Sequence, residues 1–188
     1  AMTEASHVGD LVTRLALSHP EVSFRFINNG QVKLHTSGNG NLKDVIYHIY
    51  GREIASNLIE VDFERKGIHI TGYLGKPLIS RGNRNFENYF VDGRYIKSSI
   101  ISKAIEDGYK DFTMQHKYPF VVLYLDVDTE HVDVNVHPTK MDVRFNNQQE
   151  IYNTLFAAVD DGLHERELIP EVTLDDIKIP EEPKDCKS

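Results

Sequence analysis

The chain has 188 residues, 40% of them hydrophobic and 27% charged, which is enough to bury one core and is typical of a soluble globular protein. It contains no apolar run long enough to cross a bilayer and no secretion signal at its start, so we expect a cytoplasmic protein with no membrane partner. Its single cysteine, Cys186, excludes an intrachain disulfide and a cluster of thiolate metal ligands.

The net charge of −8 is unevenly distributed along the chain. Residues 160–188 carry ten acidic and four basic side chains, which accounts for −6 of the total. Residues 76–103 instead carry six basic side chains and two acidic ones, a local charge of +4. The six basic residues are Lys76, Arg81, Arg84, Arg94, Lys97 and Lys103. A protein that binds a phosphate backbone needs such a patch, but an ordinary solvated surface has the same composition.

The first predicted elements are a helix and a hairpin. Apolar residues recur at helical spacing over 8–16, and Pro20 closes this amphipathic helix. Thr3 or Ser6 can cap its beginning. Alternating residues then flank the triplet 28–30, Asn-Asn-Gly, which favours the positive backbone dihedrals of a tight turn. This pattern predicts a hairpin.

A second helix and a second hairpin follow. The helix is predicted over 42–50, where the apolar spacing is again helical and Gly51 can end it. Two alternating stretches, 58–64 and 68–74, are joined by the turn residues 65–67.

The middle of the chain predicts strands around one helix. The aromatic residues of 85–91 suit a strand, and the turn at 92–93 leads toward a helix at about 98–112. The stretch 120–127 is apolar almost throughout, so we expect a central strand that is covered on both faces. The stretch 131–137 alternates strictly, which predicts a strand with one buried face.

A last helix is predicted from Asn147, with Glu150 completing a capping box, and a proline-containing acidic linker beyond Gly162. The order of hairpins, helix, strands and helix describes a two-layer α/β (α+β) domain with helices packed on a sheet.

Enzyme and metal motifs give no positive signal. The glycines of 38–40 and 72–76 do not have the spacing of a P-loop, and we interpret them as turn glycines. His131, Asp133 and His137 would share a strand face, but the two histidines are too far apart along a strand to bind one ion, so we expect no metal. No nucleophile-elbow sequence supports hydrolase chemistry.

One segment, 132–145, combines features that suit a phosphate contact. Pro138 biases the end of the predicted strand toward extended geometry, and Lys140 then stands on a short loop before apolar alternation resumes. A lysine on a stiff loop can hold a point charge at a fixed distance from a phosphate, although most loop lysines are merely solvated.

Five runs of this sequence resemble MutL-type DNA mismatch repair proteins, in the same order along the chain. The runs are LALSHPEVSFRFINNG, VIYHIYG, YFVDGRYIKSSIISKAI, YPFVVLYLDVD and VDVNVHPTKMDVRF. The last is very similar to a signature of that family. The resemblance covers nearly everything in 6–159.

The resemblance implies a fold and a division of the chain. It implies a transducer domain with a ribosomal-S5-domain-2-like fold, whose βαβ crossover is left-handed against the usual rule. Residues 1–20 would be a helix at the junction with a GHKL ATPase domain that this chain lacks. Residues 21–163 would be the transducer domain, and 164–188 the start of an acidic, proline-containing linker.

The resemblance also implies a role for Lys140. The family lysine at this position reaches into the neighbouring ATPase domain and touches the γ-phosphate of ATP, which distinguishes ATP from ADP. The rest of the nucleotide site, including the Mg²⁺ ligand, would lie outside this chain. The fragment would therefore not be an enzyme, whereas the parent protein would be an ATPase and in some relatives an endonuclease.

The implied partners are DNA, a MutS-type mismatch-recognition protein and, in the full-length protein, a second copy of it. Family members bind DNA through a basic groove to which the helix after Gly93 contributes, and the matching bases here are Arg94, Lys97 and Lys103. Ser98 and Ser99 occupy positions where relatives often carry further charge.

Two other classes of protein remain open from sequence. A type II topoisomerase transducer would couple ATP to strand passage, but its lysine loop lacks the VDVNVHPTK context. A free-standing RNA-binding module with the same fold would need aromatic side chains on an exposed sheet face, for which Phe86, Tyr89 and Tyr95 are the candidates.

Overall fold

The computed structural model describes residues 3–128 and 145–168. The helices and strands are α1 (Glu4–Ser18), β1 (Arg25–Asn28), β2 (Gln31–His35), α2 (Leu42–Tyr50), α3 (Arg52–Ala55), β3 (Leu58–Arg65), β4 (Ile68–Gly75), β5 (Glu87–Val91), β6 (Arg94–Tyr95), α4 (Ser99–Tyr109), β7 (Val121–Val127) and α5 (Gln148–Leu168). Two short 3₁₀ helices, Pro77–Ile79 and Arg84–Phe86, precede β5.

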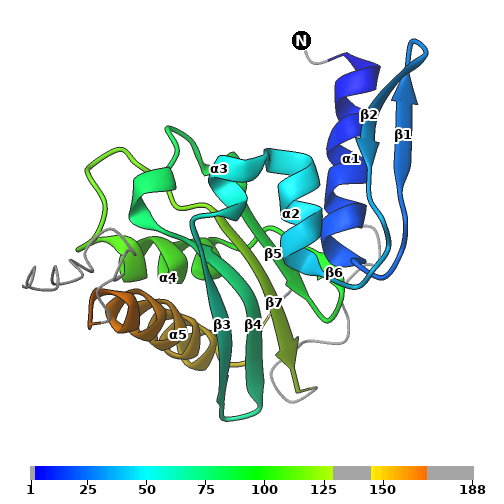
Figure 1. Ribbon diagram of the computed structural model, residues 1–188. Coiled ribbons are helices and arrows are strands. Elements are labelled where there is room, and N and C mark those ends of the chain that lie inside the picture. The colour runs from blue at the N-terminus through cyan, green and yellow to red at the C-terminus, as the bar shows by residue number, and fades with distance from the viewer. Residues whose placement is uncertain (1–2, 129–144, 169–188) are drawn as a thin grey trace, which may run out of the picture.

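The first helix and hairpin form as predicted. Thr3 caps α1, because its side-chain oxygen accepts a hydrogen bond from the backbone N–H of Ser6. Asn29 and Gly30 take φ values of +50° and +75°, the left-handed geometry that a two-residue hairpin turn requires. Strands β1 and β2 pair only with each other among the described residues, and Figure 1 shows them beside α1, away from the main sheet.

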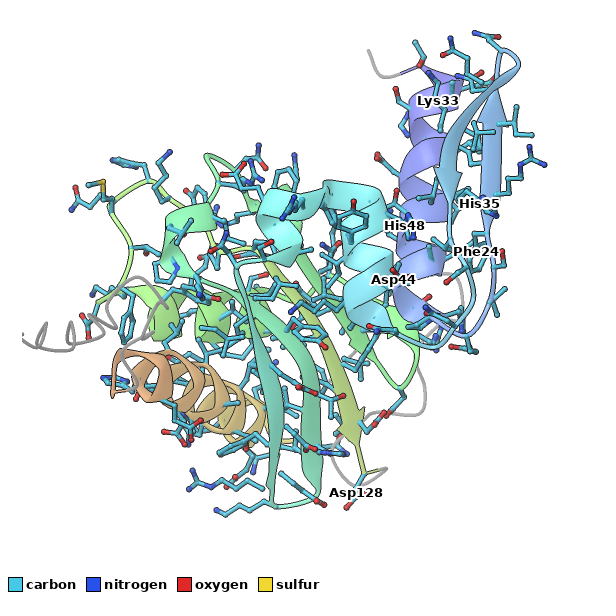
Figure 2. The ribbon with its side chains drawn as sticks, viewed as in Figure 1. Phe24, Lys33, His35, Asp44, His48 and Asp128 are labelled. Atoms are coloured by element: carbon cyan, nitrogen blue, oxygen red, sulfur yellow. The ribbon has the colours of Figure 1, made fainter. Side chains whose placement is uncertain are left out.

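Helix α2 lies between the hairpin and the main sheet (Figure 1). It begins and ends as the sequence predicts, with Asn41 accepting a hydrogen bond from the Asp44 backbone and Gly51 following the last turn at a φ of +92°. The Asp44 carboxylate also accepts hydrogen bonds from Ser37 and Asn39, which ties the loop after β2 to the helix. Figure 2 shows Asp44 on α2, beside this loop.

The main sheet has the strand order β3-β4-β7-β5-β6. Strand β7 lies in the centre, antiparallel to β4 and parallel to β5. The prediction of a central strand at 120–127 is therefore confirmed. Helix α4 connects the parallel strands β5 and β7, which is the βαβ unit of this fold.

Two hydrophobic cores lie on opposite faces of this sheet. Side chains of α4 and α5 pack on one face against Ile70 and Leu123, which are fully buried. Side chains of α1, α2 and α3 pack on the other face against Phe90 and Val122. Successive side chains of a strand point to opposite faces of the sheet, so the central strand β7 contributes side chains to both cores. This agrees with the expectation that the strand at 120–127 is covered on both faces, although the two-layer description of the domain did not include the second layer of helices.

The interpretation of Gly72 as a turn glycine is wrong. Gly72 lies in the middle of β4, opposite Leu123 of β7, and has a φ of +122°. A Cβ atom there would lie 2.1 Å from the carbonyl oxygen of Val122, so the neighbouring backbone approaches too closely for any side chain.

The structure differs from the sequence-based expectation at three other boundaries. Residues 84–86 form a 3₁₀ turn, so the predicted strand begins only at Glu87. The short strand β6 lies between the turn at 92–93 and α4, where no strand was expected. Helix α5 begins after Asn147, whose side chain accepts from the Glu150 backbone as predicted, but it continues to Leu168. The predicted strand 131–137 lies outside the described residues.

Candidate functional site

The basic patch predicted from sequence is less positive in the structure than its local count. Arg84 donates two hydrogen bonds to the Glu106 carboxylate, at 2.5 and 3.3 Å. Lys103 donates to Asp107 at 2.9 Å. Both acids lie just beyond the counted stretch on α4. Helical spacing places Asp107 one turn from Lys103, whereas tertiary packing brings Arg84 of the second 3₁₀ helix to Glu106.

The three residues predicted to contact DNA occupy different settings. Arg94 lies on β6 and is exposed, and Lys97 is exposed on the segment that leads into α4. Lys103 lies on α4 and donates to Asp107. The Asp107 carboxylate accepts a second hydrogen bond, from the Tyr152 hydroxyl of α5 at 2.5 Å. The hydrogen bond from Tyr152 is the main cause of a lowered pKa of Asp107, and the hydrogen bond from Lys103 lowers this pKa further. The Asp107 carboxylate therefore stays charged and binds the Lys103 ammonium.

A cavity of about 680 Å³ opens beside β5, and we call it the α1–β5 groove. The residues that matter for its chemistry are Arg14 of α1, Tyr50 of α2, Glu87 and Asn88 of β5, Tyr95 of β6, and Lys97. Strand β6 pairs only with Phe90 and Val91, so no described strand covers the outer edge of β5 at Glu87 and Asn88. The groove follows this uncovered edge.

Glu87 is the chemically unusual residue of the groove. Its side chain is 8% exposed, and its Oε1 atom has no hydrogen-bond partner among the described residues. Burial, together with the neighbouring Glu106 carboxylate, raises the pKa of Glu87 to about 8. At neutral pH its carboxyl group is therefore mostly protonated, and its hydrogen bond with Glu106 also raises its pKa.

Arg14 and Lys97 bring positive charge to the groove, and Asp10 of α1 brings one negative charge to it. The Arg14 guanidinium stacks over the Tyr95 ring, 4.3 Å from its centroid, and it forms no ion pair within residues 3–128 and 145–168. Lys97 has no ion-pair partner in the same ranges. Deeper in the groove, the Asn88 amide donates to the Tyr50 hydroxyl at 3.3 Å.

Sequence reasoning missed Arg14, Glu87 and Asn88 as site residues. A signal was present, because Glu87 and Asn88 are polar residues inside a stretch that otherwise predicts a buried strand. The sequence offered less reason to select Arg14. It lies among the apolar positions of α1, where a basic residue on the polar face of a helix is common. Only the fold brings α1 beside β5.

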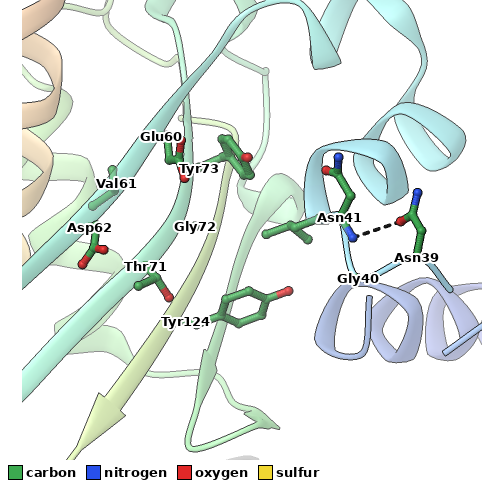
Figure 3. Close-up of a pocket in the computed structure, with 11 residues that line it drawn as sticks. Asn39, Gly40, Asn41, Glu60, Val61, Asp62, Thr71, Gly72, Tyr73 and Tyr124 are labelled. Carbon is green, nitrogen blue, oxygen red and sulfur yellow. Dashed lines mark hydrogen bonds between the residues drawn. The ribbon is translucent and has the colours of Figure 1, made fainter. Parts of the chain in front are cut away.

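A second cavity, of about 520 Å³, lies between the loop 39–41 and the open face of β3, β4 and β7. Figure 3 shows Glu60, Asp62 and Tyr73 on the sheet side of it. Two acids and no base line it among the described residues, so it repels a phosphate group. Asp62 in addition accepts from His69 at 2.6 Å, which raises the pKa of His69.

Lys140 and the three residues weighed as metal ligands, His131, Asp133 and His137, lie outside the described residues. The structure does fix both ends of the stretch that contains them. The backbone N–H of Val127, at the end of β7, donates to Asp92 at 3.0 Å, and Phe145, just before α5, is 7% exposed in the core. Asp128 follows β7 at the far end of the sheet from the hairpin (Figure 2).

The aromatic residues that an RNA-binding module would need are not displayed on an open sheet face. Tyr89 is 4% exposed, and its hydroxyl bonds with Ser98 and Ser102. Phe86 and Tyr95 pack against the second core. No helix in the described part of the chain is long and apolar enough to span a membrane.

Comparison with known proteins identifies the family. Residues 46–164 match the family described as DNA mismatch repair protein, C-terminal domain. The chain is 58% identical over 180 residues to the DNA mismatch repair protein MutL of Agathobacter rectalis, covering 96% of this chain and 28% of that protein. It is 43% identical over 162 residues to MutL of Clostridium botulinum, covering 86% and 24%. The chain thus spans about a quarter of the length of these relatives.

Solved structures agree in fold. A structure described as the N-terminal domain of a DNA repair protein superposes with a TM-score of 0.72 at 21% identity, covering 87% of this chain and 54% of that one. The ATPase domain of the mismatch repair endonuclease MutL of Aquifex aeolicus superposes with a TM-score of 0.53 at 18% identity, covering 82% and 51%. The family match and the MutL relatives together show that this chain belongs to the MutL family of DNA mismatch repair proteins.

Proposed function

We propose that this chain is the ATP-sensing transducer region of its parent protein, and that Lys140 contacts the γ-phosphate of ATP held by an ATPase domain outside the chain. The observation that carries the proposal is the sequence match to MutL proteins, which includes the HPTK run at 137–140. A structure of the Aquifex aeolicus MutL ATPase domain contains ADP, so a protein of this family binds such a nucleotide.

The proposed contact distinguishes ATP from ADP because the lysine ammonium lies at the position of the γ-phosphate. A lysine ammonium is a compact charge, and ADP has no phosphate at the position of the γ-phosphate. One lysine supplies too few contacts to hold a nucleotide, so the Mg²⁺ site and the catalytic groups belong to the ATPase domain and the fragment alone is not an enzyme. Replacing Lys140 by alanine in the intact protein and following ATP turnover tests this role.

The N-terminal elements suit a junction with that ATPase domain. Helix α1 and the hairpin expose large apolar side chains, which are Val8, Leu11, Leu15, Val22, Ile27 and Val32. Neighbouring exposed apolar side chains mark surfaces that another domain covers. We infer that residues 1–20 and the hairpin contact the ATPase domain, that 164–188 begin the linker, and that the crossover of the S5-like fold is left-handed.

DNA is the proposed partner of the surface around Arg94 and Lys97. We expect changing Arg94, Lys97 and Lys103 together to glutamate to weaken duplex binding by the intact protein, because phosphate neutralisation releases counterions. Of the three, Lys103 contributes least, since Asp107 already neutralises it. Fluorescence anisotropy over a salt series measures the effect, and wild-type affinity with an unchanged salt slope would place the DNA face elsewhere. A MutS-type protein and a second copy of the parent protein are the other partners that we propose.

A further inference from the structure

Strand β3 has an open edge beside a partly open sheet face. Within the described ranges β3 pairs with β4 alone, and its outer side forms no backbone hydrogen bond to another described segment. Helices α4 and α5 cover one face of the sheet, whereas α1, α2 and α3 leave part of the other face exposed. The cavity of about 520 Å³ lies over that exposed part. An open sheet edge is a template for a further strand.

The exposed part of this face is acidic. Glu60, Asp62 and Glu64 are exposed and alternate along β3, so they point to the same face. The strand register places Glu64, His69 and Asp126 in one row across β3, β4 and β7. His69 hydrogen-bonds with Asp62 at 2.6 Å, but the described part of the chain contains no lysine or arginine paired with the other three acids. We call Glu60, Asp62, Glu64 and Asp126 the acidic face.

We propose that the open edge of β3 binds an extended basic segment of a partner protein, which adds to the sheet as a strand and places alternate lysine or arginine side chains beside the acidic face. The backbone hydrogen bonds of an added strand do not depend on its sequence, so its alternate side chains provide the selectivity. Alternate residues of a strand lie about 7 Å apart, which is also the spacing of the three acids of β3. The charges of such a segment therefore follow the acids one by one.

Charge decides among the candidate occupants of this edge. Four carboxylates repel the phosphates of a nucleic acid. A second copy of this chain that paired through β3 would set like charges opposite one another, which destabilises a strand pair. Residues 160–188 carry a net charge of −6, so the acidic end of this chain is repelled too. A basic segment of a different protein is the occupant that these charges favour.

Two tyrosine rings extend the match to a basic side chain. Tyr73 lies opposite Glu60 in the strand register, Tyr124 lies on the next strand, and both line the cavity (Figure 3). A lysine or arginine side chain that extends past Glu60 can bring its charge close to the Tyr73 ring, where cation–π attraction adds to the ion pair. The Tyr124 hydroxyl already donates to the carbonyl oxygen of Leu17, so Tyr124 offers its ring.

The inference goes beyond the proposed γ-phosphate and DNA contacts, because neither Lys140 nor Arg94 belongs to the edge of β3. The probe is a fluorescein-labelled peptide of alternating lysine and threonine, with four lysines, titrated with the 188-residue chain by anisotropy at low salt. Three comparison peptides separate the contributions to binding. One has the same composition with its lysines consecutive, one has glutamate in place of every lysine, and one is N-methylated at every backbone nitrogen.

Two double variants test the acidic face. Glu60→Gln with Glu64→Gln removes two of its charges and leaves the histidine-paired carboxylate of β3 unchanged. Glu53→Gln with Glu165→Gln is the matched control, since it removes two exposed carboxylates from α3 and α5. Thermal melting confirms that each variant is folded before it is compared.

We expect the alternating peptide to bind the wild-type chain and the glutamate peptide not to bind. Consecutive lysines should weaken binding at least about threefold, because their charges do not follow the acids. N-methylation should weaken it at least about tenfold, because the peptide can no longer donate hydrogen bonds to β3. The double change on the acidic face should weaken binding of the alternating peptide about three- to tenfold, and the control double change less than about twofold. Added salt should weaken binding by the wild-type chain.

Four results would overturn the inference. The first two are no binding of the alternating peptide by the wild-type chain and equal losses in the two double variants. The third is equal binding of the consecutive-lysine peptide, which would show attraction of positive charge without strand spacing. The fourth is undiminished binding of the N-methylated peptide, which would show that no strand adds to β3.

Discussion

The ionisation of Glu87 is coupled to folding. Its pKa is raised to about 8 in the folded chain, chiefly by burial, so the folded state holds a proton that the unfolded state releases at lower pH. The stabilising contribution of that proton is complete below the unfolded pKa and is lost as the pH rises through about 8. The free energy of unfolding should therefore contain a component that falls between mildly acidic pH and pH 8.

Replacing Glu87 by glutamine should remove that component. The amide is neutral at every pH, so the variant should exceed wild type by roughly 1 to 3 kcal/mol at pH 8 and match it near pH 4.5. Urea unfolding across this pH range gives the comparison. Glu53→Gln removes an exposed carboxylate on α3 and should leave the pH profile unchanged. A Glu87→Gln profile parallel to wild type would show that the carboxyl group is not held protonated by the fold.

At the scale of elements, the packing of α4 against α5 depends on one glycine. A Cβ atom on Gly108 would lie 2.6 Å from a methyl group of Val159, closer than real side chains approach. We expect Gly108→Ala to lower the free energy of unfolding by about 1 to 2 kcal/mol, since overpacking outweighs the better helix propensity of alanine.

Gly9 of α1 is the matched control, because its added Cβ would meet only Phe26, at 3.6 Å. Gly9→Ala should therefore stabilise the chain slightly. The double change Gly108→Ala with Val159→Ala should cost less than the sum of the single changes, because it removes the clash. Simple additivity in this cycle would contradict close helix packing.

Local patterns predicted most elements but not the features that depend on tertiary packing. Helix caps and hairpin turns depend on neighbouring residues, so Thr3, Gly51 and the turn at 28–30 could be predicted from sequence. The role of Gly72 could not be predicted, because the backbone that excludes a side chain there belongs to Val122 on β7. Strand β7 pairs with β4 but is distant from it in sequence. The same holds for the α1–β5 groove, which joins Arg14 to Glu87 through tertiary packing.

At the scale of the whole molecule, the chain matches only part of the length of its relatives. It spans 28% of the Agathobacter rectalis relative, and its exposed apolar residues concentrate on α1 and the hairpin. The stretch that contains Lys140 runs from the central strand β7 to helix α5, two elements held in the main core.

We propose that Lys140 acts in a site outside its own domain, and Lys140→Ala tests this role in two settings. Because the proposed contact lies in another domain, the change should shift the stability of the 188-residue chain by less than about 0.5 kcal/mol. In the intact protein it removes a charge-assisted hydrogen bond to the γ-phosphate worth roughly 1.5 to 3 kcal/mol, so ATP turnover should fall about ten- to a hundredfold. ADP affinity should barely change.

The decisive measurement is the ATP turnover of intact Lys140→Ala protein, recorded beside its ADP affinity and the melting of the variant fragment. A fall of one to two powers of ten with normal melting and normal ADP affinity is the result that we predict. Wild-type turnover in a normally folded variant would remove Lys140 from the mechanism, and a large loss of fragment stability would show that the lysine is structural.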